Sequence, residues 1–171
     1  MAKHRLSKAN QKLYFATIHL DAIQAVQNDE SVLNRKAQVQ ANMEAAIFHL
    51  VSAYRGFIWE LCLVHDLSPG DQMALSEVIQ LASKEGKQIQ ELNHFERLEA
   101  QSESWLAQLL SAYDKVLTLD PQTHSTEESP ASFNAIAVRK IEENETPEKI
   151  FEWHNALKSE IENFRTTLSE W

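Results

Sequence analysis

Apolar residues recur every three or four positions along most of this chain, which is the period of an α-helix rather than of a β-strand. The clearest row keeps a strict four-three spacing and contains Met43, Ile47, Leu50, Tyr54, Phe57, Leu61 and Val64. A second row beside it contains Glu44, Phe48, Val51, Arg55, Ile58, Cys62 and His65. Two adjacent rows make a broad buried face, so the pattern predicts a long central helix over about 30–65.

The same periodicity predicts four further helices, over about 7–27, 68–84, 88–118 and 146–171. Their ends carry helix-capping residues: Ser7, Ser68 and Thr146 are suitable N-caps, and Gly86 breaks the chain between two helices. Four long helices and one short helix predict an all-α fold, an antiparallel helical bundle that forms a single domain over 1–171.

One long loop is expected between the last two helices. The stretch "LDPQTHSTEESPASFN", residues 119–134, is rich in Ser, Thr and Pro, which predicts a mobile connector. The following "AIAVRKI" fits a strand, a helical turn or an arm against the bundle, and the sequence leaves these alternatives open.

Composition narrows the fold and the class of partner. Only 3 Gly and 4 Pro are present, too few for the many tight turns of a β-sandwich. The formal charge is −9: residues 1–65 carry 7 Lys+Arg and 5 Asp+Glu (+2), and residues 66–171 carry 9 and 20 (−11). Such an acidic chain repels phosphate backbones, which disfavours nucleic acid as a partner.

The chain is expected in the cytoplasm rather than in a membrane or outside the cell. Its one cysteine, Cys62, excludes an intramolecular disulfide and fits a reducing compartment, and the N-terminus lacks the apolar core of a signal peptide. Extending the apolar stretch 45–62 to the roughly 20 residues that span a bilayer includes Glu44 and Glu60, which are costly in hydrocarbon.

Arg55 and Gly56 interrupt the most apolar part of the central helix. An arginine on a packed face needs an anion or carbonyl groups beside it. A glycine inside a helix costs about 1 kcal/mol, which indicates that another helix or a ligand approaches the backbone there. A structural ion pair, a guanidinium reaching solvent at a helix crossing, and an anion-binding site all fit. With Tyr54 and His65 these residues form the predicted ligand-binding set.

No metal, cofactor or catalytic site is predicted. Glu91 and His94 form the one Glu-x-x-His spacing, where a diiron bundle needs two, and Cys62 and His65 supply only two of the four usual zinc ligands. The chain lacks a Gly-x-Ser-x-Gly elbow, a phosphate-binding loop and a dinucleotide fingerprint. These features favour a non-catalytic binding protein that contacts an unidentified protein partner or a second copy of itself.

Three segments carry a resemblance to a known family: "RLSKANQKLYFATIHLDAI", "ANMEAAIFHLVSAYRGFIWELC" and "FEWHNALKSEIENFRTTLSEW". Together they resemble an uncharacterised all-helical gammaproteobacterial family of unknown function, and the resemblance implies a small cytoplasmic helical bundle.

The central segment is also similar, more loosely, to HEPN-type bundles, which include ribonucleases. This similarity implies an alternative function, a nuclease or nucleotide-binding bundle that uses Arg55. HEPN ribonucleases carry an Arg followed four to six residues later by His. Here the next histidine after Arg55 is His65, so no catalytic residue is carried over.

Overall fold

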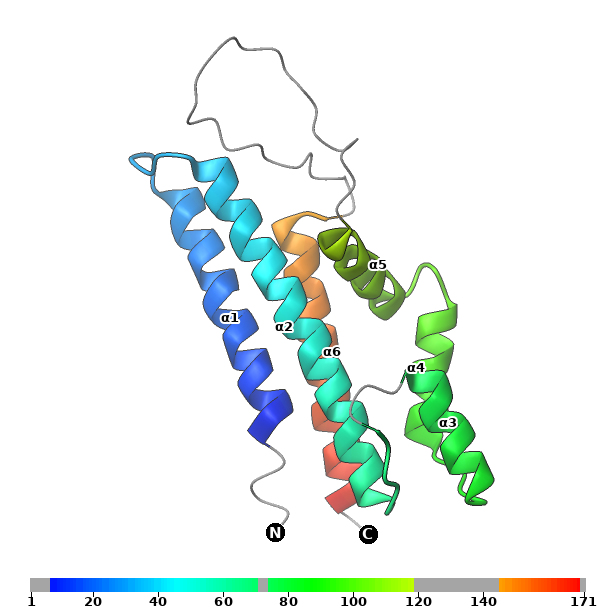
Figure 1. The fold of residues 1–171 in the computed structure, drawn as a ribbon. Coiled ribbons are helices and arrows are strands. Elements are labelled where there is room, and N and C mark those ends of the chain that lie inside the picture. The colour runs from blue at the N-terminus through cyan, green and yellow to red at the C-terminus, as the bar shows by residue number, and fades with distance from the viewer. Residues whose placement is uncertain (1–6, 71–73, 119–144, 170–171) are drawn as a thin grey trace.

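The computed structural model describes residues 7–70, 74–118 and 145–169, and every regular element in these ranges is an α-helix (Figure 1). The helices are α1 (Ser7–Asn28), α2 (Arg35–Val64), α3 (Leu75–Lys84), α4 (Gln90–Ala100), α5 (Trp105–Leu117) and α6 (Pro147–Ser169). The all-α prediction is confirmed. The predicted loop over 119–134, the segment after it and Trp171 lie outside the described residues.

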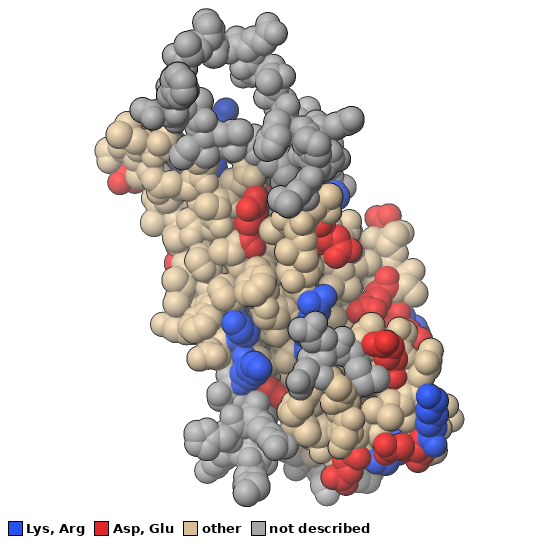
Figure 2. All heavy atoms as spheres, viewed as in Figure 1, with Lys and Arg blue, Asp and Glu red and all other residues tan. Residues whose placement is uncertain are grey.

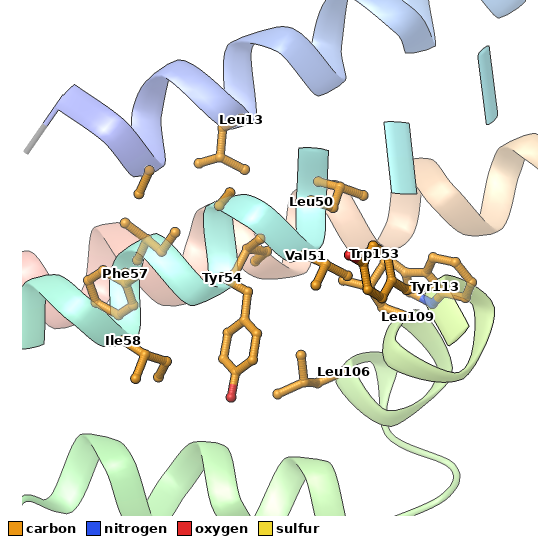
Figure 3. Close-up of a cluster of buried hydrophobic side chains, with 14 of the residues drawn as sticks. Leu13, Leu50, Val51, Tyr54, Phe57, Ile58, Leu106, Leu109, Tyr113 and Trp153 are labelled. Atoms are coloured by element: carbon orange, nitrogen blue, oxygen red, sulfur yellow. The ribbon is translucent and has the colours of Figure 1, made fainter. Parts of the chain in front are cut away.

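Helix α2 is the element on which most of the others pack. It forms a long antiparallel hairpin with α1, and α4, α5 and α6 all contact it, while α3 packs on α4 (Figure 1). Figure 3 shows the resulting core, with Leu13 of α1, Leu106 of α5 and Trp153 of α6 beside the buried side of α2. Trp153 is 1% exposed and so belongs to this core.

The predicted rows of α2 are confirmed in most positions. The first row is buried except for its last member, Val64. In the second row Val51, Ile58 and Cys62 are buried, but Arg55 is exposed. The prediction that Arg55 lies on a packed face is therefore wrong, because the buried face of α2 is narrower than the two rows together.

By length and composition α2 is also able to cross a membrane. Half of its most apolar 18-residue window is buried inside the fold, and the core helix of a soluble protein meets the same criterion. The apolar character of α2 is accounted for by the helices that pack on it.

The predicted helix over 88–118 is two helices, so the prediction of four long helices and one short helix is wrong at this point. Helix α4 ends at Ala100 and α5 begins at Trp105. The Ser104 hydroxyl accepts a hydrogen bond from the Ala107 N–H at 3.0 Å and donates to the Leu98 carbonyl. Ser104 is thus an N-cap, and Ser102, two residues before it, is exposed.

Two helix starts also differ from the prediction, whereas one helix end and one N-cap agree with it. Helix α2 begins at Arg35 rather than near 30, and α3 at Leu75 rather than after Ser68. The break at Gly86 is confirmed: its φ of +70° is typical of the residue after a helix C-terminus. The N-cap of α6 is confirmed as well, since the Lys149 N–H donates to the Thr146 hydroxyl at 3.3 Å.

A buried ion pair joins the C-terminal half of α6 to the α1–α2 hairpin. Arg165 donates to Glu60 of α2 at 2.7 Å and to the Asn10 side chain of α1 at 2.6 Å. Its guanidinium carbon also lies 5.8 Å from the centre of the Phe57 ring. Because Glu60 is only 9% exposed, this pair neutralises a carboxylate that would be costly to bury alone.

We predict that Arg165→Met lowers the free energy of unfolding by about 2–4 kcal/mol, because it leaves Glu60 buried without its cation. Urea denaturation followed by circular dichroism measures this change. The double variant with Glu60→Gln should recover part of the loss. If Arg165→Met lowers the free energy of unfolding by less than about 0.5 kcal/mol, the Glu60 carboxylate is in contact with solvent, and the prediction is wrong.

The sequence predicts that another helix or a ligand approaches the backbone at Gly56, and the structure identifies this neighbour as α1. A Cβ atom added to Gly56 would lie 3.7 Å from the backbone nitrogen and 3.9 Å from the Cβ of Ala9. These are ordinary van der Waals distances, so the site accepts a methyl group and nothing larger without moving α1.

We predict that Gly56→Ala raises the free energy of unfolding by about 0.5–1 kcal/mol, because alanine is the better residue inside a helix. Gly56→Leu should lower it by about 1–3 kcal/mol, since the larger side chain collides with α1. Thermal and urea unfolding test both variants. If Gly56→Ala instead lowers the free energy of unfolding, α1 and α2 lie closer together at Gly56 than these distances indicate.

Candidate binding surface

The four residues predicted to form a ligand site lie next to one another in sequence or on one helix, but they point to different neighbours. Tyr54 is buried against α4, where its hydroxyl donates to Glu99 at 2.8 Å. Arg55 lies over Tyr113 of α5, and Gly56 faces α1. His65 is the C-cap residue of α2, ten positions and about 15 Å of helix beyond Arg55. The structure does not bring these four residues together.

Burial fixes the role of Tyr54 as a neutral hydrogen-bond donor. Burial, together with the nearby Glu99 carboxylate, raises the pKa of Tyr54 well above its usual value. The phenol therefore stays protonated and holds α2 to α4. Cys62 is similarly inert, because burial raises the pKa of its thiol to about 11.

Arg55 belongs to a different arrangement. Its guanidinium carbon lies 5.2 Å from the centre of the Tyr113 ring, a cation–π geometry. Arg55 is exposed, so the guanidinium remains accessible to solvent while its carbon lies near the Tyr113 ring. Of the three alternatives that the sequence left open, the guanidinium that reaches solvent at a helix crossing matches this position.

Around Arg55, rings and cations from three helices form one continuous network. Phe48 of α2 lies 6.4 Å from Tyr113 and 5.4 Å from His49, measured between ring centres. His49 in turn lies 5.3 Å from Phe15 of α1. The Lys12 amine lies 5.6 Å from the Phe15 ring centre and 5.9 Å from that of Phe48. We call this network the aromatic–cationic face; it consists of Lys12, Phe15, Phe48, His49, Arg55 and Tyr113.

The accessible centre of the aromatic–cationic face consists of Phe48 and Arg55, whereas Tyr113 beneath them is buried. Phe48 is 44% exposed, an unusual position for a phenylalanine on a helix that already buries a broad apolar face. Figure 2 shows the α1–α2 side of the molecule as a largely uncharged surface, with Lys and Arg atoms near its middle and Asp and Glu atoms toward the α1–α2 turn.

Two histidines lie stacked at the α1 edge of this face. The rings of His19 and His49 are 5.5 Å apart and nearly parallel, with an interplanar angle of 14°. His19 is held in place by a 2.9 Å hydrogen bond between its Nδ1 and the Asn42 side chain. Partial burial of His49, with Lys12 and His19 close by, lowers the pKa of His49 below its usual value of 6.5.

Two further histidines of the described residues join helices to one another. His94 bonds Glu160 at 3.1 Å and so joins α4 to α6, and His154 bonds Thr17 of α1 at 3.1 Å. Among the described residues, no three His, Cys, Asp or Glu side chains gather closely enough to hold a metal ion. A shallow cavity of about 380 Å³ lies between α3 and α4, lined in part by Ala82.

Sequence reasoning identified Arg55 but missed the rest of this face. The sequence places Phe48 in a buried row, and it does not identify Phe15 and Tyr113 as site residues. Their shared signal is weak in a single sequence, because the contacts join α1, α2 and α5 across many residues. The one available sign is that Phe48 and Arg55 lie in the same row of the central helix.

The family of the chain follows from its full-length match. A model described as a family of unknown function, DUF6586, matches residues 1–171. The chain belongs to the DUF6586 family. This agrees with the resemblance to an uncharacterised family that the sequence suggested. No curated protein and no solved structure matches the chain, so the function of this DUF6586 member is argued from its own residues.

We predict that His49 makes the folded protein less stable as the pH falls below about 6.5, because the unfolded chain binds the proton more tightly than the folded protein does. His49→Gln should therefore lose less stability than the unmodified protein between about pH 7.5 and pH 5.5. Urea denaturation at several pH values measures this difference. Parallel curves for the two proteins would contradict the prediction.

Proposed function

We propose that this protein is a non-catalytic binding protein that acts in the cytoplasm and contacts another protein through the aromatic–cationic face. The observation that carries the proposal is the continuous ring and cation network across α1, α2 and α5, centred on the exposed Phe48 and Arg55. The single cysteine, Cys62, fits the reducing interior of a cell.

The composition of the face supports protein recognition. Aromatic residues and arginine are enriched at the centres of protein interfaces, where they contribute most of the binding energy. Tyr113 is buried, so its contact with Arg55 limits the side-chain freedom that Arg55 loses when a partner binds. All the contributing side chains project from helices, which hold them more precisely than loops would.

The geometry supports binding over nuclease action. A HEPN-like nuclease needs a histidine close to its catalytic arginine, and His65 lies about 15 Å along α2 from Arg55. The exposed guanidinium stacks on Tyr113 rather than facing a cleft with a general base.

Site-specific photo-crosslinking tests the proposal. A photoreactive phenylalanine replaces Phe48 in the full chain, expressed in the cells that naturally produce it, and the matched control carries the same residue in place of the exposed Lys158 on α6. We expect a protein adduct of defined mass from position 48 and none from position 158. Equal adducts from both positions, or none from either, would contradict the proposed function.

Arg55→Met separates binding from stability. Because Arg55 is exposed, we expect the free energy of unfolding to change by at most about 1 kcal/mol, the size of an exposed cation–π contact. Adduct formation from position 48 should fall strongly in this variant. A large loss of stability instead would assign Arg55 a structural role.

A further inference from the structure

We infer that the partner of the aromatic–cationic face is an acidic amphipathic helix of another protein, which places its apolar side on Phe48 and its carboxylates on Lys12 and Arg55. The inference rests on the proposed function and adds the chemistry of the partner. It follows from the distribution of charge along the hairpin and from the shape of the exposed side of α2.

The cations of the face are available to an anionic partner. Lys12 and Arg55 lie near aromatic rings. At these contacts the neighbour of each cation is a ring and not a carboxylate of this chain. The carboxylate of α2 nearest to Arg55 in sequence is Glu60, and it is buried against Arg165. A guanidinium can donate two parallel N–H groups to one carboxylate, and Arg55 is exposed to such a partner.

The acidic residues Asp21 and Glu44 lie away from the two cations of the face. Asp21 of α1 lies nine residues beyond Lys12, and Glu44 of α2 lies eleven residues before Arg55, so each is about 14–16 Å along its helix from the cation. Because α1 and α2 run antiparallel, these two carboxylates lie nearer to the α1–α2 turn along their helices than Lys12 and Arg55 do (Figure 1). An acidic segment is attracted to one end of the face only.

The rest of the chain directs an acidic partner to this place. Residues 66–171 carry a net charge of −11, against +2 for residues 1–65, so the part of the chain that follows the hairpin repels carboxylates overall. Electrostatic complementarity of this kind fixes orientation and excludes other docking sites.

The exposed row of α2 suits a helical partner. Ala41, Ala45 and Ser52 precede and follow Phe48 at spacings of three or four, and all are at least partly exposed. Small side chains let a second helix approach, and Phe48 supplies a single large anchor among them. An amphipathic helix that packs along α2 covers Phe48 and reaches Lys12 on one side and Arg55 on the other.

Two synthetic amphipathic peptides of about 20 residues, long enough to form helices in water, test the inference. They share one leucine stripe, and their polar positions are Glu in one and Lys in the other. Fluorescence anisotropy with the full-length protein measures both affinities at low and high salt. We expect the Glu peptide to bind at least about tenfold more tightly than the Lys peptide, with the difference reduced at high salt.

Matched variants assign the binding to the face. The double variant Lys12→Glu with Arg55→Glu should weaken binding of the Glu peptide at least about tenfold, and Phe48→Ser should weaken it at either salt concentration. The control Lys158→Glu changes an exposed lysine on α6 and should leave the affinity unchanged. Circular dichroism and thermal unfolding confirm that each variant is folded.

Three outcomes would overturn the inference: no binding of the Glu peptide, equal binding of both peptides, or equal weakening by Lys158→Glu. Vesicles of phosphatidylglycerol and phosphatidylcholine provide a further probe. Binding of these vesicles, lost in the Lys12 and Arg55 variants, without binding of the Glu peptide would identify a lipid surface instead. A photo-crosslink from position 48 to a protein without an acidic helix would overturn only the partner's chemistry and leave the proposed binding function in place.

Discussion

The close contact between α1 and α2 is the constraint on which the rest of the structure depends. It is made by small residues: Ala9 and Ala16 of α1 and Ala53 of α2 are fully buried, and Gly56 brings its backbone against Ala9. Small side chains let the two backbones lie near each other over the length of α1, so the hairpin forms one rigid layer. Helices α4, α5 and α6 then pack on the opposite side of α2, which supplies the central row of the core (Figure 3).

This packing explains why one row of the apolar helix α2 remains exposed. With α1 on one flank of α2 and α5 on the other, only a narrow row of α2 remains exposed, and Phe48 and Arg55 lie on it. The flanking helices supply Lys12, Phe15 and Tyr113, so each exposed α2 residue is bordered by fixed neighbours. The aromatic–cationic face is thus a consequence of how the hairpin is covered.

Much of the fold was predictable because local signals and burial agree. The four-three row of α2, the break at Gly86 and the Thr146 cap each have one physical cause within a few residues. The split at Ser104 was missed because apolar spacing continues across it, and only the cap chemistry of Ser104 interrupts the helix. The candidate face was not predictable, since its contacts join residues as far apart in sequence as Phe48 and Tyr113, and periodicity carries no information about which helices become neighbours.

Arg55 shows how that missing information changes the interpretation of a residue. On a buried face, an arginine must be neutralised, as Arg165 and Glu60 neutralise each other in this fold. On an exposed row beside Tyr113, the same side chain needs no anion from its own chain, so its charge is directed outward. The protein therefore contains one cation that holds α6 to the hairpin and others that face solvent. Burial, which decides between these roles, depends on the position of α5 and not on the residues next to Arg55.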